Sequence, residues 1–141
     1  DNREIGLRYY QKALKLKPKH LVGLNNRGYE YNMQGLYDRA IRDFNKAIKI
    51  DPSFAFSYNN RGLAKIKLGH IEEGLADIQK SIELDPNNAY TYRNNGIYHF
   101  DLGEFSAALP YFKKSFNMDP STHLLKDYLE RTEKHLKSLG K

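Results

Sequence analysis

The sequence contains no cysteine, which excludes disulfide bonds and thiolate metal sites. It has no apolar run of about 18 residues, so no membrane-spanning helix is predicted. Neither a phosphate-binding glycine loop nor a nucleophile motif appears, and the histidines do not have the spacing of metal ligands. We therefore expect no cofactor, no metal site and no enzymatic activity. The histidines are His20, His70, His99, His123 and His135.

A period of 34 residues dominates the chain. Residues 55–88 align without a gap to residues 21–54 and to residues 89–122. A fixed period of this size is typical of stacked-repeat solenoids, in which each unit buries its apolar face against the next. Seven recurring helices, an apolar content of 40% and a charged content of 28% indicate an ordered protein. The shared marks are Asn26, Asn60 and Asn94; Gly28, Gly62 and Gly96; Gly35, Gly69 and Gly103; and Pro52, Pro86 and Pro120.

Each repeat is predicted to form two helices. In the central repeat, Tyr58, Gly62 and Ile66 recur at i, i+4 and i+8, which places them on one helical stripe. Gly69 ends this first helix, because glycine reaches the left-handed conformation at low cost. Pro86 ends the second helix, because the residue before a proline disfavours the α region. Small residues let the paired helices approach closely, namely Gly28 with Ala40, Gly62 with Gly74, and Gly96 with Ala108.

The period and its asparagine, glycine and proline marks resemble the tetratricopeptide repeat (TPR) family. This resemblance implies an all-α fold, a right-handed superhelix of antiparallel helix pairs that a C-terminal capping helix closes. It divides the chain into the second helix of a truncated repeat (1–20), three repeats (21–54, 55–88 and 89–122) and the cap (123–141).

Residues 1–20 match the second helix of the central repeat, with a helix predicted over residues 2–17. Two interpretations stay open: the chain is cut from a longer array, or this lone helix is a native N-terminal cap. The side chains of Leu7, Tyr9, Tyr10 and Leu14 lack the helix that would cover part of them. We therefore expect this end to pack against another chain, including a second copy of itself, or to fray.

The third repeat contains Pro110 inside its predicted second helix. An interior proline removes one backbone hydrogen bond and costs about 3 kcal/mol. The helix is therefore expected to be kinked there or to begin later than its counterparts. In the alternative, Pro110 lies in the first turn of a helix that starts near Leu109.

Beyond Pro120 a helix is predicted near residues 122–138. One side of it carries an apolar stripe and the remainder is charged, as expected for a helix that covers the last pair and faces water. The stripe consists of Leu125, Tyr128, Leu129, Thr132, Leu136 and Leu139.

In the TPR family the first helices of successive pairs line a concave surface, where ligands bind. The resemblance therefore implies an extended peptide or partner segment in this groove. An asparagine amide both donates and accepts, so a ladder of asparagines suits a peptide backbone. The ladder could equally be a relic of repeat duplication, or a set of hydrogen bonds between helices of the scaffold. The candidate peptide-binding residues are Asn25, Asn26, Tyr29, Phe56, Asn59, Asn60, Leu63, Tyr90, Arg93, Asn94 and Ile97.

The carboxylate clamp, another binding mode of TPR proteins, is disfavoured. It requires two lysines and an arginine, whereas Asn25 and Tyr90 occupy the lysine positions and Asn94 the arginine position. Arg93, one residue away, is a candidate for contact with a carboxylate.

The net charge is +6, and Lys12, Lys15, Lys17 and Lys19 gather much of the excess near the N-terminus. Nucleic-acid binders usually spread basic residues along the binding face, so a solvated helix end is the simpler interpretation. We expect a protein or peptide partner, no nucleic acid and no membrane. Self-association or intramolecular docking within a larger protein is the alternative function, and electrostatic nucleic-acid binding is a weaker one.

Overall fold

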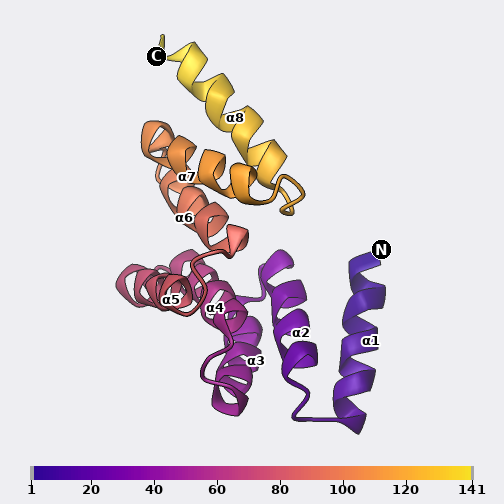
Figure 1. Ribbon diagram of the computed structural model, residues 1–141. Coiled ribbons are helices and arrows are strands. Elements are labelled where there is room, and N and C mark those ends of the chain that lie inside the picture. The colour runs from indigo at the N-terminus through magenta and orange to yellow at the C-terminus, as the bar shows by residue number, and fades with distance from the viewer. Residues whose placement is uncertain (1, 141) are drawn as a thin grey trace. The chain divides into compact units, whose positions relative to one another are not determined.

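A computed structural model describes residues 2–140, and in these residues all regular structure is helical (Figure 1). The all-α prediction is confirmed. The described residues form eight helices, one more than the seven counted from the repeat pattern, because the lone helix, three pairs and cap themselves make eight. The helices are α1 (Asn2–Leu16), α2 (Leu21–Met33), α3 (Tyr37–Ile50), α4 (Ala55–Lys67), α5 (Ile71–Leu84), α6 (Ala89–Asp101), α7 (Phe105–Met118) and α8 (Leu125–Ser138).

The chain divides into two compact units, Asp1–Leu84 and Asp85–Lys141. In the first unit each helix packs against the next, and α2 also contacts α4. In the second unit α6 packs on α7 and α7 on α8, while α8 also reaches α6. Contacts between α2 and α4 join two successive repeats through their first helices, as the repeat pattern requires.

Glycines end the first helix of each repeat, as predicted. Gly35, Gly69 and Gly103 have φ angles of 73°, 89° and 75°, in the left-handed region that glycine tolerates best. After Gly69, the His70 N–H donates to the Lys65 carbonyl at 2.9 Å, which satisfies a carbonyl of the last helical turn.

The second helix of each of the three repeats ends just before an aspartate and a proline, at positions 51–52, 85–86 and 119–120. The Asp51 carboxylate accepts hydrogen bonds from the Ser53 Oγ–H at 2.6 Å and the Ser53 N–H at 2.9 Å. Both bonds favour the ionised carboxyl, so they lower the pKa of Asp51. Asp119 and Ser121 repeat this turn with the same two bonds, and the pKa of Asp119 is lowered for the same reason.

Glycines also set the distance between paired helices. A Cβ added to Gly62 would lie 2.7 Å from the Gly74 carbonyl oxygen, and one added to Gly74 would lie 2.6 Å from the Gly62 carbonyl oxygen. The backbones of α4 and α5 therefore touch. In the first repeat Gly28 faces the ring of Phe44 instead, which is fully buried.

The helix that contains Pro110 does not begin late. Helix α7 starts at Phe105, the repeat position at which α3 and α5 also start, so the later start and the start near Leu109 were both wrong. Pro110 lies in the second turn and cannot donate to the Ser106 carbonyl. Both residues are exposed, and water can satisfy that carbonyl. A kink at Pro110 stays a prediction.

Helix α8 begins at Leu125, three residues later than predicted, after Leu124 adopts a left-handed φ of 62°. The predicted stripe faces the helix pair in part: Leu125 and Thr132 are buried and Leu136 is half-buried, whereas Leu139 is 62% exposed. The Tyr128 ring stacks on the Phe112 ring with 5.4 Å between centroids, which fixes α8 on α7.

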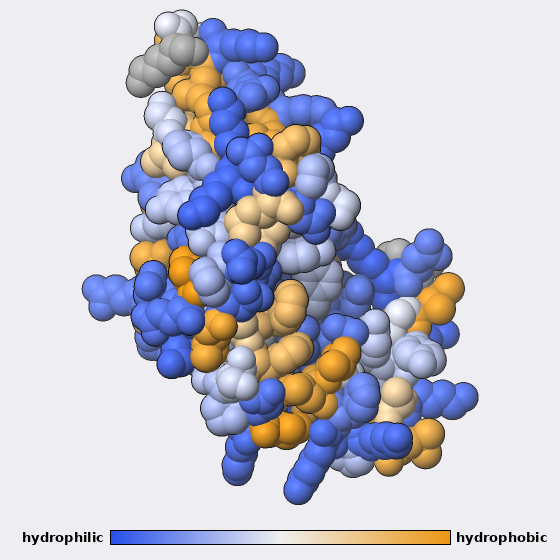
Figure 2. Space-filling view, viewed as in Figure 1, coloured by the Kyte–Doolittle hydropathy of each residue, from blue (hydrophilic) through white to orange (hydrophobic). Residues whose placement is uncertain are grey.

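The exposed face of α1 differs from the predicted one. Leu14 was expected to lack cover, but it is buried in a cluster with Leu24 and Ala47. The large exposed side chains are Ile5, Tyr9 and Leu16, at 66%, 69% and 83%. At about 100° per residue these three form a single stripe opposite Leu14. Figure 2 shows hydrophobic atoms at the surface over α1, at the lower right.

The glycine contacts predict a matched pair of stability changes. Gly62→Ala drives a methyl group into the Gly74 backbone and should lower the free energy of unfolding by about 1–3 kcal/mol. Gly6→Ala meets no atom within 4 Å and should raise stability by up to about 1 kcal/mol through helix propensity. Urea unfolding followed by circular dichroism measures both. Equal effects of the two substitutions would contradict the close approach of α4 and α5.

Candidate peptide-binding surface

The asparagines of α2 and α4 form a hydrogen-bond network between the two helices. The Asn25 Oδ1 accepts from the Ser57 Oγ–H at 3.2 Å and from the Asn60 Nδ2 at 3.3 Å. The Asn32 Nδ2 donates to the Asn60 carbonyl at 2.9 Å. All four residues are buried. This arrangement has the geometry expected if the ladder holds the scaffold together.

Other members of the ladder differ in exposure. Asn59 and Asn94 are fully buried. Asn26 is half-buried, and its Nδ2 donates to the Tyr10 Oη on α1 at 3.5 Å, a long bond. Among the asparagines of the predicted site, Asn26 therefore keeps the most accessible amide.

Arg93 holds α6 to the segment that precedes α8. Its side chain donates to the Asn94 Oδ1 at 2.9 and 3.1 Å and to the His123 carbonyl at 2.8 Å. The guanidinium lies 4.8 Å from the centroid of the Tyr90 ring, and Arg93 is only 1% exposed. The guanidinium donors of Arg93 are therefore engaged within the second unit.

Two apolar side chains near the start of the first helices are exposed, one in the predicted site and one at the same repeat position. Phe56, in the first turn of α4, is 41% exposed, and Val22, at the same repeat position of α2, is 48% exposed. Tyr29 and Tyr90 are half-buried, whereas Leu63 and Ile97 are buried. The surface of α2 and α4 thus presents two apolar side chains one repeat apart.

Two ion pairs at equivalent repeat positions were missed from the sequence. The Arg27 guanidinium donates two hydrogen bonds of 2.7 Å to Asp43, and Arg61 does the same to Asp77. The bonded carboxylate raises the pKa of Arg27. Each pair ties the first helix of its repeat to the second. Arginine and aspartate recurring at a 34-residue step were a visible signal. In the third repeat the same positions are Asn95 and Tyr111.

The described residues offer neither of two other kinds of site. Residues 2–140 contain no group of three His, Cys, Asp or Glu side chains placed to hold a metal ion. No helix within the same residues has the length and apolar character needed to cross a bilayer. His99 is partly buried, stacked on Tyr111 and 2.7 Å from a Glu104 carboxylate oxygen.

Helix pairs of constant length, in which a left-handed glycine follows each first helix, define an α-helical repeat protein. Residues 22–54 and residues 55–88 each match a model of the tetratricopeptide repeat. The chain is a tetratricopeptide repeat protein, as the sequence pattern predicted. No curated protein matches the chain.

Solved structures of tetratricopeptide domains share the fold. The first TPR domain of human RPAP3 has a TM-score of 0.67 and 23% identity, covering 86% of this chain and 95% of that one. The Arabidopsis OM64 TPR domain has a TM-score of 0.65 and 22% identity, covering 82% and 95%. The first TPR of Spaghetti (RPAP3), bound to the HSP90 peptide SRMEEVD, has a TM-score of 0.63 and 22% identity, covering 83% and 93%.

The asparagine network predicts a loss of stability when its acceptor is removed. Asn25→Ala leaves the Ser57 hydroxyl and the Asn60 amide without their shared partner, so the free energy of unfolding should fall by about 1–3 kcal/mol. Asn26→Ala removes only a long, half-buried bond and should cost less than about 1 kcal/mol. Thermal and urea unfolding of both variants test this difference. A larger loss for Asn26→Ala would contradict the assignment.

Proposed function

We propose that the chain binds an extended segment of a partner protein on the accessible face of its first helices. Tetratricopeptide repeats generally mediate protein–protein interaction. For this chain we assign the partner-binding surface to the groove along the first helices. The observation that carries it is the exposure of Val22 and Phe56 at one repeat position on neighbouring helices. Apolar side chains exposed one repeat apart offer contacts to alternate side chains of an extended peptide.

Within the predicted site we assign different roles to accessible and buried residues. In the first unit Asn26, Tyr29 and Phe56 are proposed to contact the partner, Asn26 through the peptide backbone and the rings through side chains. In the second unit Tyr90 is the corresponding candidate. The buried members are proposed to hold the helices that present these contacts. They are Asn25, Asn59, Asn60, Leu63, Arg93, Asn94 and Ile97.

A similar fold binds a peptide in another protein: the first TPR of Spaghetti (RPAP3) is bound to the HSP90 peptide SRMEEVD. That likeness supports peptide binding as a capability of the fold. The likeness does not favour binding of an acidic peptide C-terminus in this groove, because Asn25 and Tyr90 occupy the positions at which a carboxylate clamp has lysines. The donors of Arg93 are also engaged within the second unit.

Truncation of Phe56 tests the proposed groove. Peptides selected from a displayed random library against the wild-type chain serve as probes, and calorimetry measures their affinity. Phe56→Ala should weaken binding about tenfold or more, because an exposed aromatic ring at the centre of an interface is a frequent hot spot. Phe116→Ala is the matched control, since Phe116 is 39% exposed but lies on α7. If Phe116→Ala weakens binding as much as Phe56→Ala, the groove assignment fails.

A double substitution separates the two roles of the asparagines. Asn60→Ala combined with Asn94→Ala should lower the melting temperature, while the affinity measured on the folded fraction stays near that of wild type. Thermal unfolding and calorimetry on the same sample give both numbers. The opposite result, weaker binding with an unchanged melting temperature, would indicate that these amides bind the peptide backbone and would contradict their assignment to the scaffold.

Self-association is the second candidate function, and the exposed stripe of α1 favours it. Ile5, Tyr9 and Leu16 are exposed on one face of the helix, and a second copy would cover them. Sedimentation equilibrium should detect a dimer that the Ile5→Glu, Tyr9→Glu double substitution dissociates. The control Leu102→Glu, at a residue 55% exposed after α6, should leave association unchanged. A monomer at every concentration would exclude this function.

A further inference from the structure

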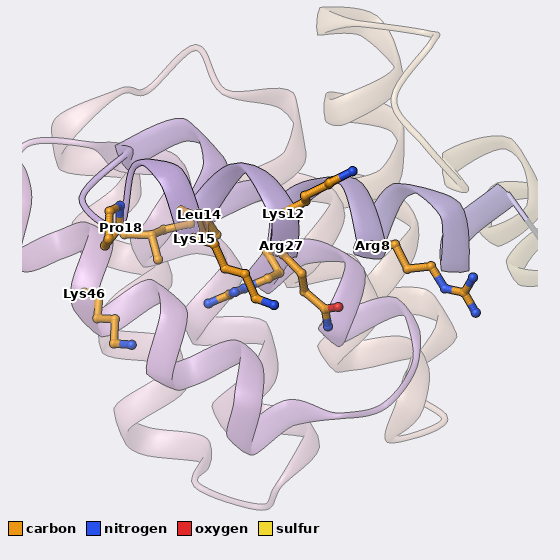
Figure 3. Close-up of a pocket in the computed structure, with 9 residues that line it drawn as sticks. Arg8, Lys12, Leu14, Lys15, Pro18, Arg27 and Lys46 are labelled. Carbon is orange, nitrogen blue, oxygen red and sulfur yellow. The ribbon is translucent and has the colours of Figure 1, made fainter.

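A groove lies between α1 and α3. Both helices pack against α2, but within the described residues their backbones do not come into contact. The gap leaves a cavity of about 540 Å³ whose lining comes from all three helices and from the loop after α1 (Figure 3). The lining residues are Arg8, Gln11, Lys12, Leu14, Lys15, Pro18, Leu24, Arg27 and Lys46.

The floor of this groove is aliphatic, and the groove continues past Lys46. Leu14 and Leu24 are buried beneath it. A second cavity of about 570 Å³ shares Pro18, Leu24 and Lys46 with the first. It adds Ile50, which is 40% exposed. Because the two cavities share these three lining residues, they form one continuous groove.

All charged side chains on this lining are cations. Arg27 is neutralised by Asp43 at 2.7 Å, and Arg8 pairs with Glu4 at 2.8 Å. Lysines make up the rest, and none of them forms an ion pair with a described residue. These unpaired lysines are Lys12, Lys15 and Lys46 in the first cavity and Lys19 and Lys49 in the second. In Figure 3, Lys15 and Lys46 come from different helices around the cavity.

The groove faces away from the proposed peptide surface. At about 100° per residue, Val22, Asn26 and Tyr29 share one side of α2, while Leu24 and Arg27 point to the opposite side. A ligand in the α1–α3 groove therefore occupies a different face of α2 from a ligand that contacts Phe56.

We propose that the α1–α3 groove binds a second partner segment, an extended acidic peptide in which carboxylates alternate with aliphatic side chains. The aliphatic side chains lie over Leu24 and Ile50, and the carboxylates meet the unpaired lysines at the rim. Complementary charge of this kind speeds association and selects the partner. The choice of a peptide over nucleic acid follows from the lining, which contains no aromatic ring for base stacking.

The test uses two fluorescein-labelled peptides, one alternating glutamate with leucine and one with glutamine in place of glutamate. Fluorescence anisotropy with the whole chain at low salt should show binding of the glutamate peptide only. The Lys15→Glu, Lys46→Glu double substitution should weaken that binding about tenfold or more, because each change replaces an attraction by a repulsion. Equal binding of both peptides, or of neither, overturns the proposal.

Two controls sharpen the result. Lys134→Glu with Lys137→Glu makes the same charge change on the exposed face of α8 and should weaken binding by less than about threefold. Phe56→Ala should leave the acidic peptide bound, so this site and the peptide groove can fail separately. A single-stranded oligonucleotide of equal charge should bind more weakly than the glutamate peptide. Tighter binding of the oligonucleotide, or an equal loss in the α8 variant, overturns the proposal.

Discussion

Close contact between the two helices of a repeat is the constraint on which the other features depend. In the central repeat the backbones of α4 and α5 meet at Gly62 and Gly74, with no room for a Cβ on either. Because the helices are this close, Arg61 on α4 reaches Asp77 on α5 at 2.7 Å, and Lys65 reaches the same carboxylate at 3.0 Å. The ion pairs follow from the packing, since their side chains meet only when the helix axes are near.

The sequence predicted the helix boundaries of the repeats but not the roles of their asparagines, which depend on how closely the helices pack. Gly69 specifies a left-handed helix end wherever it occurs, so the local pattern predicted the helix boundary correctly. Asn60 is different, because an amide suits a peptide backbone and a neighbouring helix equally well. Only the positions of Asn25 and Ser57 on the folded chain show that its amide faces another asparagine. For this reason the sequence could place candidate residues on the first helices, but it could not separate the exposed candidates from the buried ones.

The wrong predictions for α1 and for Pro110 on α7 have a related cause, because each was made from residue types without their packing. The repeat pattern predicted that Leu14 and Tyr9 would both lack cover. In the structure Leu14 packs against Leu24 and Ala47, whereas Tyr9 is exposed. Comparison with the central repeat does not settle which stripe of a terminal helix packs. Pro110 was judged as a helix breaker by its residue type, and its exposed position on α7 lets the helix start where the other repeats start theirs.

The glycine contacts also bear on how the repeats diverged. In the first repeat Gly28 lies against the ring of Phe44, with Ala40 beside it, while the central repeat has Ile78 and Gly74 at the corresponding positions. In the central repeat Ile78 replaces the larger Phe44, and Gly74 replaces Ala40 with the loss of a methyl group. Both positions lie on the second helix and, in the central repeat, face a glycine of the first helix, so exchanging a whole second helix keeps them together, whereas changing only one of them alters the volume packed against that glycine. Equal length alone therefore does not make single residues interchangeable between the repeats, because the two positions on the second helix together fill the space beside that glycine.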